Sequence, residues 1–445
     1  MSKLRLTFYG DDLTGSTDAL EQLAAFGVRA MLFIEPPTRT QLKKFPNLQA
    51  LGVAGMTRAL TPGAMEKALR PAFQKLKALG ARHVHYKICS TFDSSPQIGN
   101  LGRVMDVAAK FFPAAFIPLL VATPALGRYT IFGNHFARFG IGSEGEIHRL
   151  DRHPAISRHP ITPMNEGDLR LHLAKQTKRK IALFDILTVA LPAKESRAAL
   201  KKILTSQPPV VLFDAIDDAQ IWRIGGLIDE YASAQQPLFS IGASGIEMAL
   251  GGHWAKKRRR PTLASAVKQV LVGSGSCSPV TEKQILWALK NGFAEVGLDA
   301  EKMTTKNSRP EIMRATNVAV KFLQNGRSVI VHTTKSGADQ RIAAKFKNNS
   351  AKILGTALGV VLRGALAERK VRRLCIAGGD TSSFAARALG VEALEMHAPL
   401  TPGAPLCRAF APQSPADGME IIFKGGQVGA ENYFKIVKEG GRGAR

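Results

Sequence analysis

Two adjacent carboxylates lie in a short segment that follows the first apolar run of the chain. Residues 6–9 lead into G-D-D-L-T-G at residues 10–15, and a helix is expected from about Ser16. Polar groups just beyond the carboxyl end of a parallel strand lie where α/β sheets bind ligands. Asp11 and Asp12 could there act as a general base, ligate a metal or accept hydrogen bonds from hydroxyls. Helix capping is the structural alternative, but one Asp is enough for a cap, so the pair favours a functional site.

A loop that combines a cation with hydroxyl groups follows another apolar run. Lys87 opens the segment K-I-C-S-T-F-D-S-S at residues 87–95. A cation and hydroxyl donors suit a carboxylate or a phosphate, although a solvated serine-rich loop fits these residues equally well. Arg58 and Arg128 also follow apolar runs. Each of them alone is more often a surface arginine.

Three glycine-rich turns occur in the C-terminal half, each at the expected end of a strand. They are V-G-S-G-S-C-S at residues 272–278, A-G-G-D-T-S at 377–382 and K-G-G at 424–426. Glycine lets backbone N–H groups approach phosphate oxygens, and a helix N-terminus adds a favourable partial charge. Three such turns in one half predict nucleotide binding. None fits the P-loop or the dinucleotide pattern, which argues against a P-loop enzyme and against a dehydrogenase of the Rossmann type.

Several other catalytic classes lack their sequence signatures. The ten histidines form no H-E-x-x-H motif and the four cysteines form no C-x-x-C pair, so zinc catalysis and a disulfide framework are not indicated. No G-x-S-x-G segment is present, so a serine hydrolase is not supported. No apolar run approaches 18 residues and the N-terminus lacks a signal-peptide core, so we expect a cytoplasmic protein with no membrane partner.

The net charge of +26 invites a nucleic-acid interpretation. Its 61 Lys and Arg against 35 Asp and Glu are spread over both halves, and the one dense basic cluster is K-K-R-R-R at residues 256–260. No aromatic RNA-binding strand, Cys/His finger or basic heptad array accompanies this charge. A basic surface that attracts small anions explains it at least as well, and no specific nucleic-acid partner is expected.

Elements that alternate between strand and helix must position these residues. In the N-terminal half, short apolar runs take turns with segments of helical period, which predicts βαβ units and a mainly parallel sheet. The expected strands are 4–9, 29–34, 50–53, 84–86, 114–120, 180–184, 210–213 and 238–241, with helices over 17–26 and 62–79. In the C-terminal half, the expected strands are 269–272, 328–332, 373–377 and 419–423, with helices over 281–291, 310–325, 351–369, 383–389 and 430–438.

The seam between the halves is expected at residues 251–261, where G-G-H-W, interpreted as turn residues, and the basic run end the periodic pattern before a proline. The prediction is therefore an α/β protein of two domains, residues 1–255 and 262–445. Each domain would have a mainly parallel sheet flanked by helices, with the active site in a cleft between the domains.

Together these motifs resemble the four-carbon acid sugar kinases, and the resemblance covers nearly the whole chain. Family members are similar in carrying D-D-x-T-G, T-R, K-x-x-S-T, P-x-x-G-R, S-G-S-C-S, G-G-D-T and K-G-G segments, here at residues 11–15, 57–58, 87–91, 124–128, 274–278, 378–381 and 424–426. The resemblance implies an ATP-dependent kinase of small sugar acids in carbohydrate acid catabolism. It further implies that the N-terminal domain holds the sugar acid and the C-terminal domain holds ATP with Mg²⁺.

Roles for individual residues follow from this resemblance, because phosphoryl transfer needs positioning and charge neutralisation more than covalent chemistry. Asp12 would accept the proton of the attacking hydroxyl, and Asp11 or Asp380 would orient the metal through water, although its ligands stay open. Lys87, Arg58, Ser90 and Thr91, with Thr14 and Arg128, would hold the sugar acid. The ATP ligands would be Ser274, Ser276, Ser278, Gly378, Gly379, Asp380, Thr381, Gly425 and Gly426.

One departure from the family pattern bears on the substrate. The family usually continues S-T-L-R-G, whereas this chain has S-T-F-D-S at residues 90–94, with Asp93 in place of the arginine. An acid in place of an arginine changes which anion or hydroxyl can be held there. A divergent branch that uses a 3-oxo or branched sugar acid, such as an apionate-derived one, is therefore expected.

Two rival functions stay open at this stage. An aldolase, isomerase or dehydrogenase of the same sugar acids would use Lys87 as a Schiff-base or general-base residue and would not consume ATP. A basic nucleic-acid-binding protein would be retained on duplex DNA with a steep salt dependence. The oligomeric state is also open, with a homodimer among the options.

Overall fold

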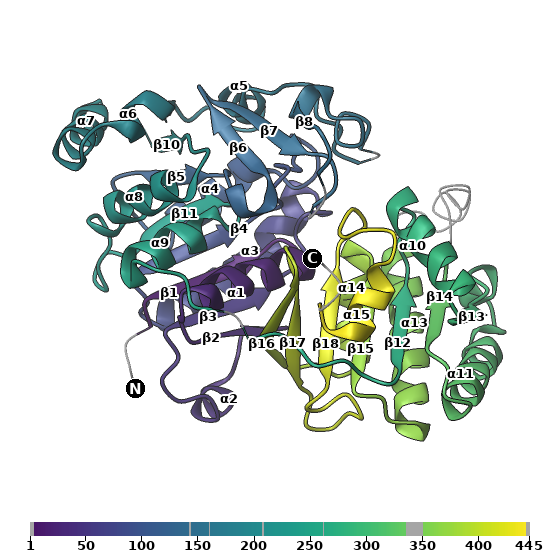
Figure 1. Ribbon diagram of the computed structural model, residues 1–445. Helices are drawn as coiled ribbons and strands as arrows, with labels where there is room; N and C mark the ends of the chain where they lie inside the picture. The colour runs from purple at the N-terminus through teal and green to yellow at the C-terminus, as the bar shows by residue number, and fades with distance from the viewer. Residues whose placement is uncertain are drawn as a thin grey trace. The chain divides into compact units, whose positions relative to one another are not determined.

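The computed structural model describes residues 4–141, 144–159, 161–206, 209–260, 262–334 and 350–441. The chain forms two compact units (Figure 1). The N-terminal unit comprises residues 1–139 and 144–260, and the C-terminal unit comprises residues 140–143 and 261–445. Each is an α/β unit built on its own run of strands.

The N-terminal unit contains a parallel sheet in the strand order β2-β3-β1-β4-β11-β5-β10-β9. These strands are β1 (Leu6–Gly10), β2 (Ala30–Phe33), β3 (Ala50–Ala54), β4 (His83–Lys87), β5 (Ile117–Leu120), β9 (Ile181–Phe184), β10 (Val210–Phe213) and β11 (Leu238–Gly242). Most of them are buried on both faces, as the unbroken apolar runs of the sequence indicate. The expected N-terminal strands are all present.

Helices surround this sheet and connect its strands. They are α1 (Leu13–Ala25), α2 (Arg39–Lys43), α3 (Pro62–Ala78), α4 (Leu101–Ala109), α5 (Leu169–Ala174), α6 (Ile186–Ala190), α7 (Ala193–Thr205), α8 (Asp218–Asp229) and α9 (Gly245–Ala255). Helix α1 begins at Leu13 and not near Ser16, because Asp12 caps it. Part of the D-D-L-T-G segment is therefore the first turn of a helix.

The glycine pair near the predicted seam lies inside helix α9 and does not form a turn. A Cβ at Gly251 would collide with the ring of Phe26, and one at Gly252 would collide with Trp222. The two glycines let α9 approach its neighbours closely, so the interpretation as turn residues is wrong. The helix ends at Lys256, which adopts a left-handed conformation with φ of 58°.

A small antiparallel sheet in the N-terminal unit is not anticipated by the sequence patterns. It consists of β6 (Arg128–Ile131), β7 (Asn134–Arg138) and β8 (Ile147–Arg149). Strands β6 and β7 form a tight hairpin in which Ile131 pairs with Asn134. This hairpin begins with Arg128, so it determines where that side chain lies.

The C-terminal unit has the strand order β13-β14-β12-β15-β18-β17-β16, parallel as far as β18 and antiparallel beyond it. Its strands are β12 (Val270–Ser274), β13 (Ala294–Gly297), β14 (Val329–His332), β15 (Arg373–Ala377), β16 (Ala393–Thr401), β17 (Ala404–Phe410) and β18 (Glu420–Lys424). Its helices are α10 (Pro279–Lys290), α11 (Ser308–Gln324), α13 (Ser350–Glu368), α14 (Gly379–Ala388) and α15 (Tyr433–Glu439). The predicted fold class, two α/β units with mainly parallel sheets flanked by helices, is confirmed, whereas β13, β16 and β17 are not anticipated.

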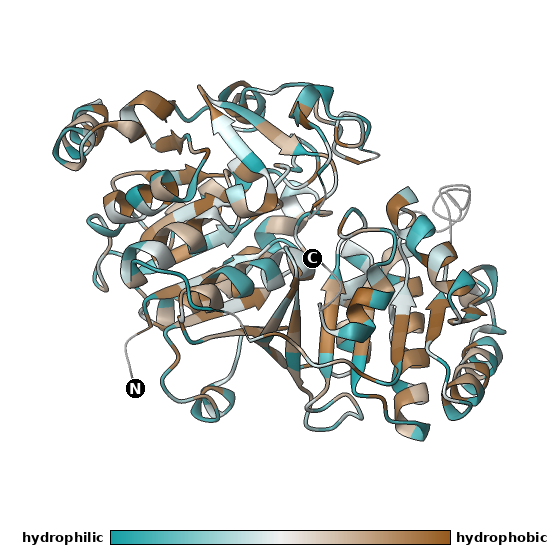
Figure 2. Ribbon diagram, in the orientation of Figure 1, coloured by the Kyte–Doolittle hydropathy of each residue, from teal (hydrophilic) through white to brown (hydrophobic). Residues whose placement is uncertain are grey.

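Helix α13 is the one described helix long and apolar enough to be tested as a membrane span. Its buried side chains include Leu358, Val361 and Leu362, and it packs against α11 and α14 within the C-terminal unit. Figure 2 shows the strands of this unit as largely hydrophobic. The packing is that of a core helix, and its length and composition alone are weak evidence for a membrane span.

Candidate functional site

Asp12 is held at the start of α1 by groups that occupy both of its carboxylate oxygens. The Oδ1 atom accepts a hydrogen bond from the backbone N–H of Gly15 at 2.7 Å. The Oδ2 atom accepts one from the Thr14 hydroxyl at 2.7 Å and lies 2.9 Å from Nη1 of Arg58. Burial alone would raise the pKa of Asp12, but the charge of Arg58 and these hydrogen bonds lower it below its usual value. Asp12 is therefore a charged anchor for Arg58 and for the helix.

Asp11 is also buried, but its carboxylate lies in a different environment. Its backbone is fixed, because its N–H donates to the carbonyl of Lys87 at 2.8 Å and its carbonyl accepts from the N–H of Arg58 at 3.2 Å. Its Oδ1 atom has no hydrogen-bond partner among the described residues. Burial raises the pKa of Asp11 to about 7, and the charge of Asp12 adds to this rise. A buried carboxylate that is half ionised near neutral pH has the properties of a general base.

Lys87 ends strand β4 and is almost completely buried. Its Nζ atom donates to the carbonyl of Ile88 at 2.8 Å and lies 3.6 Å from Oδ2 of Asp18. Burial alone would lower the pKa of Lys87, but Asp18, Asp11 and Glu247 raise it above its usual value. The lysine is therefore a permanent positive charge and not a neutral amine ready to form a Schiff base.

Asp18 and Glu247 complete this buried network, and the sequence patterns do not single them out. Glu247 of α9 lies 2.6 Å from Nδ1 of His85, and the His85 Nε2–H donates to the carbonyl of Gly242 at 3.1 Å. The available signal is weak: Asp18 and Glu247 are isolated acids on apolar helix faces. Such residues are rarely buried without a charged or hydrogen-bonding partner.

The loop after β4 is held by hydrogen bonds within itself and to strand β7. Within it, the Thr91 hydroxyl donates to Oδ1 of Asp93 at 2.7 Å and lies 3.0 Å from the Cys89 sulfur. Ser90 is largely buried, and its carbonyl accepts a hydrogen bond from Nε2 of His135 at 3.0 Å. Phe92 is buried with φ of 59°, a left-handed conformation that side chains larger than glycine seldom adopt.

Arg128 is an arginine whose charge has no carboxylate partner. The residue is only 3% exposed, and its Nη1 atom donates to the carbonyls of Leu126, Gly127 and Arg138. Among the residues that the structure describes, its Nε atom has no hydrogen-bond partner and no carboxylate forms an ion pair with the guanidinium within 4 Å. A buried cation without an anion is costly, so this side chain suits an anionic ligand. We call Asp11, Asp12, Arg58, Lys87, Arg128 and loop 88–95 the N-terminal site.

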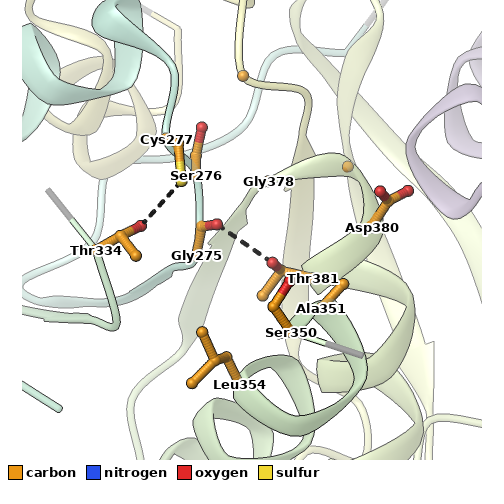
Figure 3. Close-up of a pocket in the computed structure, with 12 residues that line it drawn as sticks. Gly275, Ser276, Cys277, Thr334, Ser350, Ala351, Leu354, Gly378, Asp380 and Thr381 are labelled. Atoms are coloured by element: carbon orange, nitrogen blue, oxygen red, sulfur yellow. Dashed lines mark hydrogen bonds between the residues drawn. The ribbon is translucent and has the colours of Figure 1, made fainter. Parts of the chain in front are cut away.

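A second site lies in the C-terminal unit, where all three glycine turns border a cavity of about 250 Å³ (Figure 3). Its lining residues are Gly275, Ser276, Cys277, Thr334, Ser350, Ala351, Leu354, Gly378, Gly379, Asp380, Thr381 and Gly426. The Thr381 hydroxyl donates to the carbonyl of Gly275 at 3.3 Å and so joins the first two turns. Of the predicted ATP ligands, Ser276, Gly378, Gly379, Asp380, Thr381 and Gly426 lie together here.

Position 378 requires a glycine for two reasons. Its φ is 122°, and a Cβ would lie 3.3 Å from the backbone nitrogen of Ser276. It is followed directly by α14, which begins at Gly379 and not near residue 383, so Asp380 and Thr381 lie in the first helical turn. The N–H groups of that turn and the N-terminal end of the helix dipole face the cavity, an arrangement suited to phosphate.

Three predicted ATP ligands do not line this cavity. The Ser274 side chain is fully buried in β12 and its hydroxyl has no partner among the described residues. Ser278 caps α10, where its Oγ accepts from the N–H of Val280 at 3.3 Å. Gly425 follows Lys424, whose Nζ donates to the Gly425 carbonyl and to the Thr281 hydroxyl, both at 3.0 Å.

The third glycine turn is fastened to helix α10. The Thr281 hydroxyl donates to the carbonyl of Gly426 at 3.1 Å, and the Gln284 amide donates to the carbonyls of Val428, Gly429 and Ala430, each at 3.0 Å. Lys424 is fully buried, and burial lowers its pKa to about 7. These three side chains were not among the predicted site residues, although the lysine is part of the K-G-G segment.

No group of three or more His, Cys, Asp or Glu side chains that could hold a metal occurs among the described residues. Mg²⁺ in phosphoryl-transfer sites usually takes one or two carboxylates and completes its shell with phosphate oxygens and water. Asp380 is the carboxylate that lines the cavity. Its donor chemistry and its place beside the glycine turns fit an ion that arrives with a nucleotide.

Comparison with known proteins decides the family. Residues 6–250 match a protein-family model described as a sugar-binding N-terminal domain. Residues 271–434 match a second family model, described as a nucleotide-binding C-terminal domain. The chain belongs to the four-carbon acid sugar kinase family. The kinase relatives include a 3-oxo-isoapionate kinase from Paraburkholderia graminis, 40% identical over 98% of this chain and 94% of the relative. A 3-oxo-tetronate kinase from Methylobacterium radiotolerans is 29% identical, over 97% of this chain and 98% of the relative.

The fold of this family member agrees with a solved structure. A crystal structure of a Salmonella typhimurium LT2 protein superposes with a TM-score of 0.76 and 23% identity, covering 97% of this chain and 98% of that one. This likeness shows the fold alone. The resemblance inferred from the ordered motifs is confirmed, as is the prediction of a sugar-acid kinase that uses ATP. The roles of individual residues stay predictions.

Proposed function

We propose that this kinase transfers the γ-phosphoryl group of ATP to a hydroxyl of a small 3-oxo sugar acid. The observation that carries the proposal is the pair of unsatisfied groups in the N-terminal site. Among the residues that the structure describes, Oδ1 of Asp11 has no hydrogen-bond partner and the buried cation Arg128 has no carboxylate partner, and burial raises the pKa of Asp11 to about 7. Asp11 suits a substrate hydroxyl that must lose a proton, and Arg128 suits the carboxylate of the same substrate.

The 3-oxo character of the substrate is supported by the relatives. The Paraburkholderia graminis relative is named for 3-oxo-isoapionate and the more distant relatives for 3-oxo-tetronate. Both are small hydroxy acids with a ketone. At 40% identity across the chain, the first is the better guide to the substrate of this enzyme.

Asp11, and not Asp12, is the better candidate for the general base. Both oxygens of Asp12 are occupied by Thr14, Gly15 and Arg58, whereas Oδ1 of Asp11 has no hydrogen-bond partner within the described part of the chain. In the proposed step the substrate hydroxyl attacks the γ-phosphorus, the bond between that phosphorus and the bridging oxygen of ADP breaks, and the hydroxyl proton passes to Asp11. Arg58, held by Asp12, is near enough to influence Asp11 and would neutralise charge there.

Binding of the two substrates would be divided between the domains, residues 1–255 for the sugar acid and 262–445 for ATP. Ser90, Thr91 and Lys87 would contribute hydrogen bonds and positive charge around the sugar acid. In the C-terminal cavity, the N–H groups at Gly378 and Gly379 with the side chains of Ser276 and Thr381 would hold the phosphates. Asp380 would hold Mg²⁺, which supplies charge neutralisation to the phosphates when bound. That transfer occurs in a cleft between the domains stays a prediction.

The test is an ADP-release assay with a panel of four- and five-carbon sugar acids and their 3-oxo forms. The expected result is ADP formation that depends on a 3-oxo acid and equals the amount of phosphorylated acid. Consumption of the acid without ADP would instead support an aldolase, isomerase or dehydrogenase. Product identity by mass spectrometry separates these outcomes.

A further inference from the structure

Asp93 occupies a fixed position in the N-terminal site because the residues on both sides of it are anchored. Phe92 is fully buried in its left-handed conformation and packs edge-on against the His172 ring at 5.7 Å between centroids. The Ser94 hydroxyl donates to the carbonyl of Phe92 at 3.0 Å and accepts from the Gln176 amide at 2.9 Å. The backbone at Asp93 therefore has little freedom to swing its side chain away.

The carboxylate of Asp93 is oriented by a hydrogen bond to one of its two oxygens. Its Oδ1 atom accepts from the Thr91 hydroxyl at 2.7 Å, and its Oδ2 atom has no hydrogen-bond partner among the described residues. No arginine or lysine of the described chain forms an ion pair with it within 4 Å. An oriented carboxylate oxygen with spare capacity accepts a hydrogen bond readily from a ligand hydroxyl.

Loop 88–95 is joined to the hairpin that carries Arg128. His135 of β7 donates from Nε2 to the carbonyl of Ser90, and its Nδ1 lies 2.8 Å from the Thr130 hydroxyl of β6. Arg128 and Thr130 are two residues apart on β6, so their side chains lie on the same face of the hairpin. Consistent with this placement, burial lowers the pKa of Arg128 and the charge of Asp93 partly opposes that effect.

We propose that Asp93 and Arg128 select the substrate together: Arg128 binds the carboxylate, and Asp93 accepts a hydrogen bond from a hydroxymethyl branch close to that carboxylate. The inference rests on the proposed function and narrows its substrate to branched 3-oxo acids. An unbranched acid would offer Oδ2 of Asp93 no donor in place of the water it displaces from this half-buried side chain, which disfavours its binding. A second carboxylate at the same place would be repelled.

The test compares two 3-oxo acids, the branched 3-oxo-isoapionate and the unbranched 3-oxo-tetronate. For each acid, kcat/KM is measured with saturating MgATP, and Kd is measured by calorimetry without nucleotide. The enzymes are the wild type, Asp93→Asn and, as a matched control, Asp106→Asn. Asp106 is an exposed acid of α4 that pairs with Arg179 at 3.0 Å, outside the N-terminal site.

The wild type should prefer the branched acid. Asp93→Asn should lower kcat/KM and affinity for the branched acid by about 10- to 100-fold and change those for the unbranched acid by less than about threefold. Asp106→Asn should leave both acids unaffected. Equal losses on both acids, or no loss on either, would overturn the proposal. If the acids bind with this selectivity but no ADP forms in the wild type, the proposed function fails while the specificity role stands.

A second variant covers the case in which Asp93→Asn does not fold. Thr91→Val removes the hydroxyl that orients Oδ1 of Asp93 and nearly keeps the side-chain volume. The same selective loss on the branched acid, of smaller size, is expected. A loss on both acids alike would show that Thr91 supports the loop or binds either acid directly, and it would overturn the role of Thr91 in orienting Asp93 for the branched acid.

Discussion

Asp11 and Asp12 are adjacent in the chain, yet their carboxylates lie in opposite electrostatic environments. Asp12 accepts hydrogen bonds from Thr14 and Gly15 and forms an ion pair with Arg58, and these interactions lower its pKa. Asp11 has a buried oxygen with no hydrogen-bond partner in the described ranges, and burial raises its pKa to about 7. Two carboxylates whose pKa values are pushed apart are commonly divided into a base and an electrostatic anchor.

The first prediction separates these two roles. Asp11→Asn should lower kcat by about 10²–10⁴-fold with the MgATP affinity little changed, because it removes the proton acceptor. Asp12→Asn keeps a good N-cap but loses the ion pair with Arg58, so it should raise KM for the acid more than it lowers kcat. Steady-state kinetics with both variants check this. The reverse pattern would restore Asp12 as the base.

The second prediction concerns pH. A base with a pKa near 7 must be ionised, so kcat/KM should rise with pH through about 7 and then level off. The folding stability depends on pH in the opposite direction to kcat/KM. The folded-state pKa of Asp11 lies above the unfolded value, so the folded state binds more protons between these values and stability falls as pH rises from about 4 to 7. Asp11→Asn should therefore melt at a higher temperature than the wild type at pH 7.5, and an unchanged or lower melting temperature would contradict the burial argument.

The third prediction tests Arg128 as the carboxylate anchor. Arg128→Met keeps an unbranched apolar stem, shorter than that of arginine, and removes the charge, so the affinity for the sugar acid should fall by about 10- to 100-fold. The MgATP-induced shift in melting temperature should remain. Arg152→Met, at an exposed arginine, is the control. If the acid still binds Arg128→Met tightly, its carboxylate must be held elsewhere, with Lys87 the next candidate.

The fourth prediction concerns the nucleotide cavity. Saturating MgATP should stabilise the wild type by about 2–3 kcal/mol at a hundredfold excess over Kd. Gly378→Ala should abolish this stabilisation, because the Cβ would crowd Ser276 and the backbone would be strained. Gly326→Ala also forces a side chain onto a positive φ, here 77°, but at a place where no atom lies within 4 Å of the new Cβ, so it should melt lower yet keep the MgATP response. Thermal melting with and without MgATP distinguishes the two variants.

The fold could be predicted well where an unbroken apolar run marks a buried strand. Buried parallel strands are long apolar runs, so β1, β10 and β15 follow directly from the sequence. The hairpin β6–β7 and the strands β16 and β17 are partly polar, so no unbroken apolar run marks them, although a short turn joins each pair. Helix starts are displaced by several residues at Asp12 and Gly379 because caps and glycines look like loop in the sequence.

The candidate site could be predicted as a set of residues but not as a set of roles. Asp11 and Asp12 are equivalent in the sequence, and only the position of Arg58 separates them. The basic run at 256–260 shows the same limit: Arg258 lies 3.1 Å from Asp218 and over the ring of Phe26, contacts that its charge pattern does not predict. The sequence patterns do not single out Asp18, Glu247 and Lys424, because the importance of these charged residues depends on their burial in the folded chain.

The last prediction concerns Lys424, a buried cation with no carboxylate within 4 Å among the described residues. Its folded-state pKa of about 7 lies below its unfolded value near 10.5, so the unfolded state binds more protons between these values and stability should rise with pH across that window. Lys424→Met removes this contribution, so its melting temperature should rise less between pH 7 and 9 than that of the wild type. It also removes the hydrogen bonds to Thr281 and Gly425, which loosens the third glycine turn. KM for ATP should therefore increase while KM for the sugar acid is unchanged, and equal increases in both would show that Lys424 supports the fold as a whole.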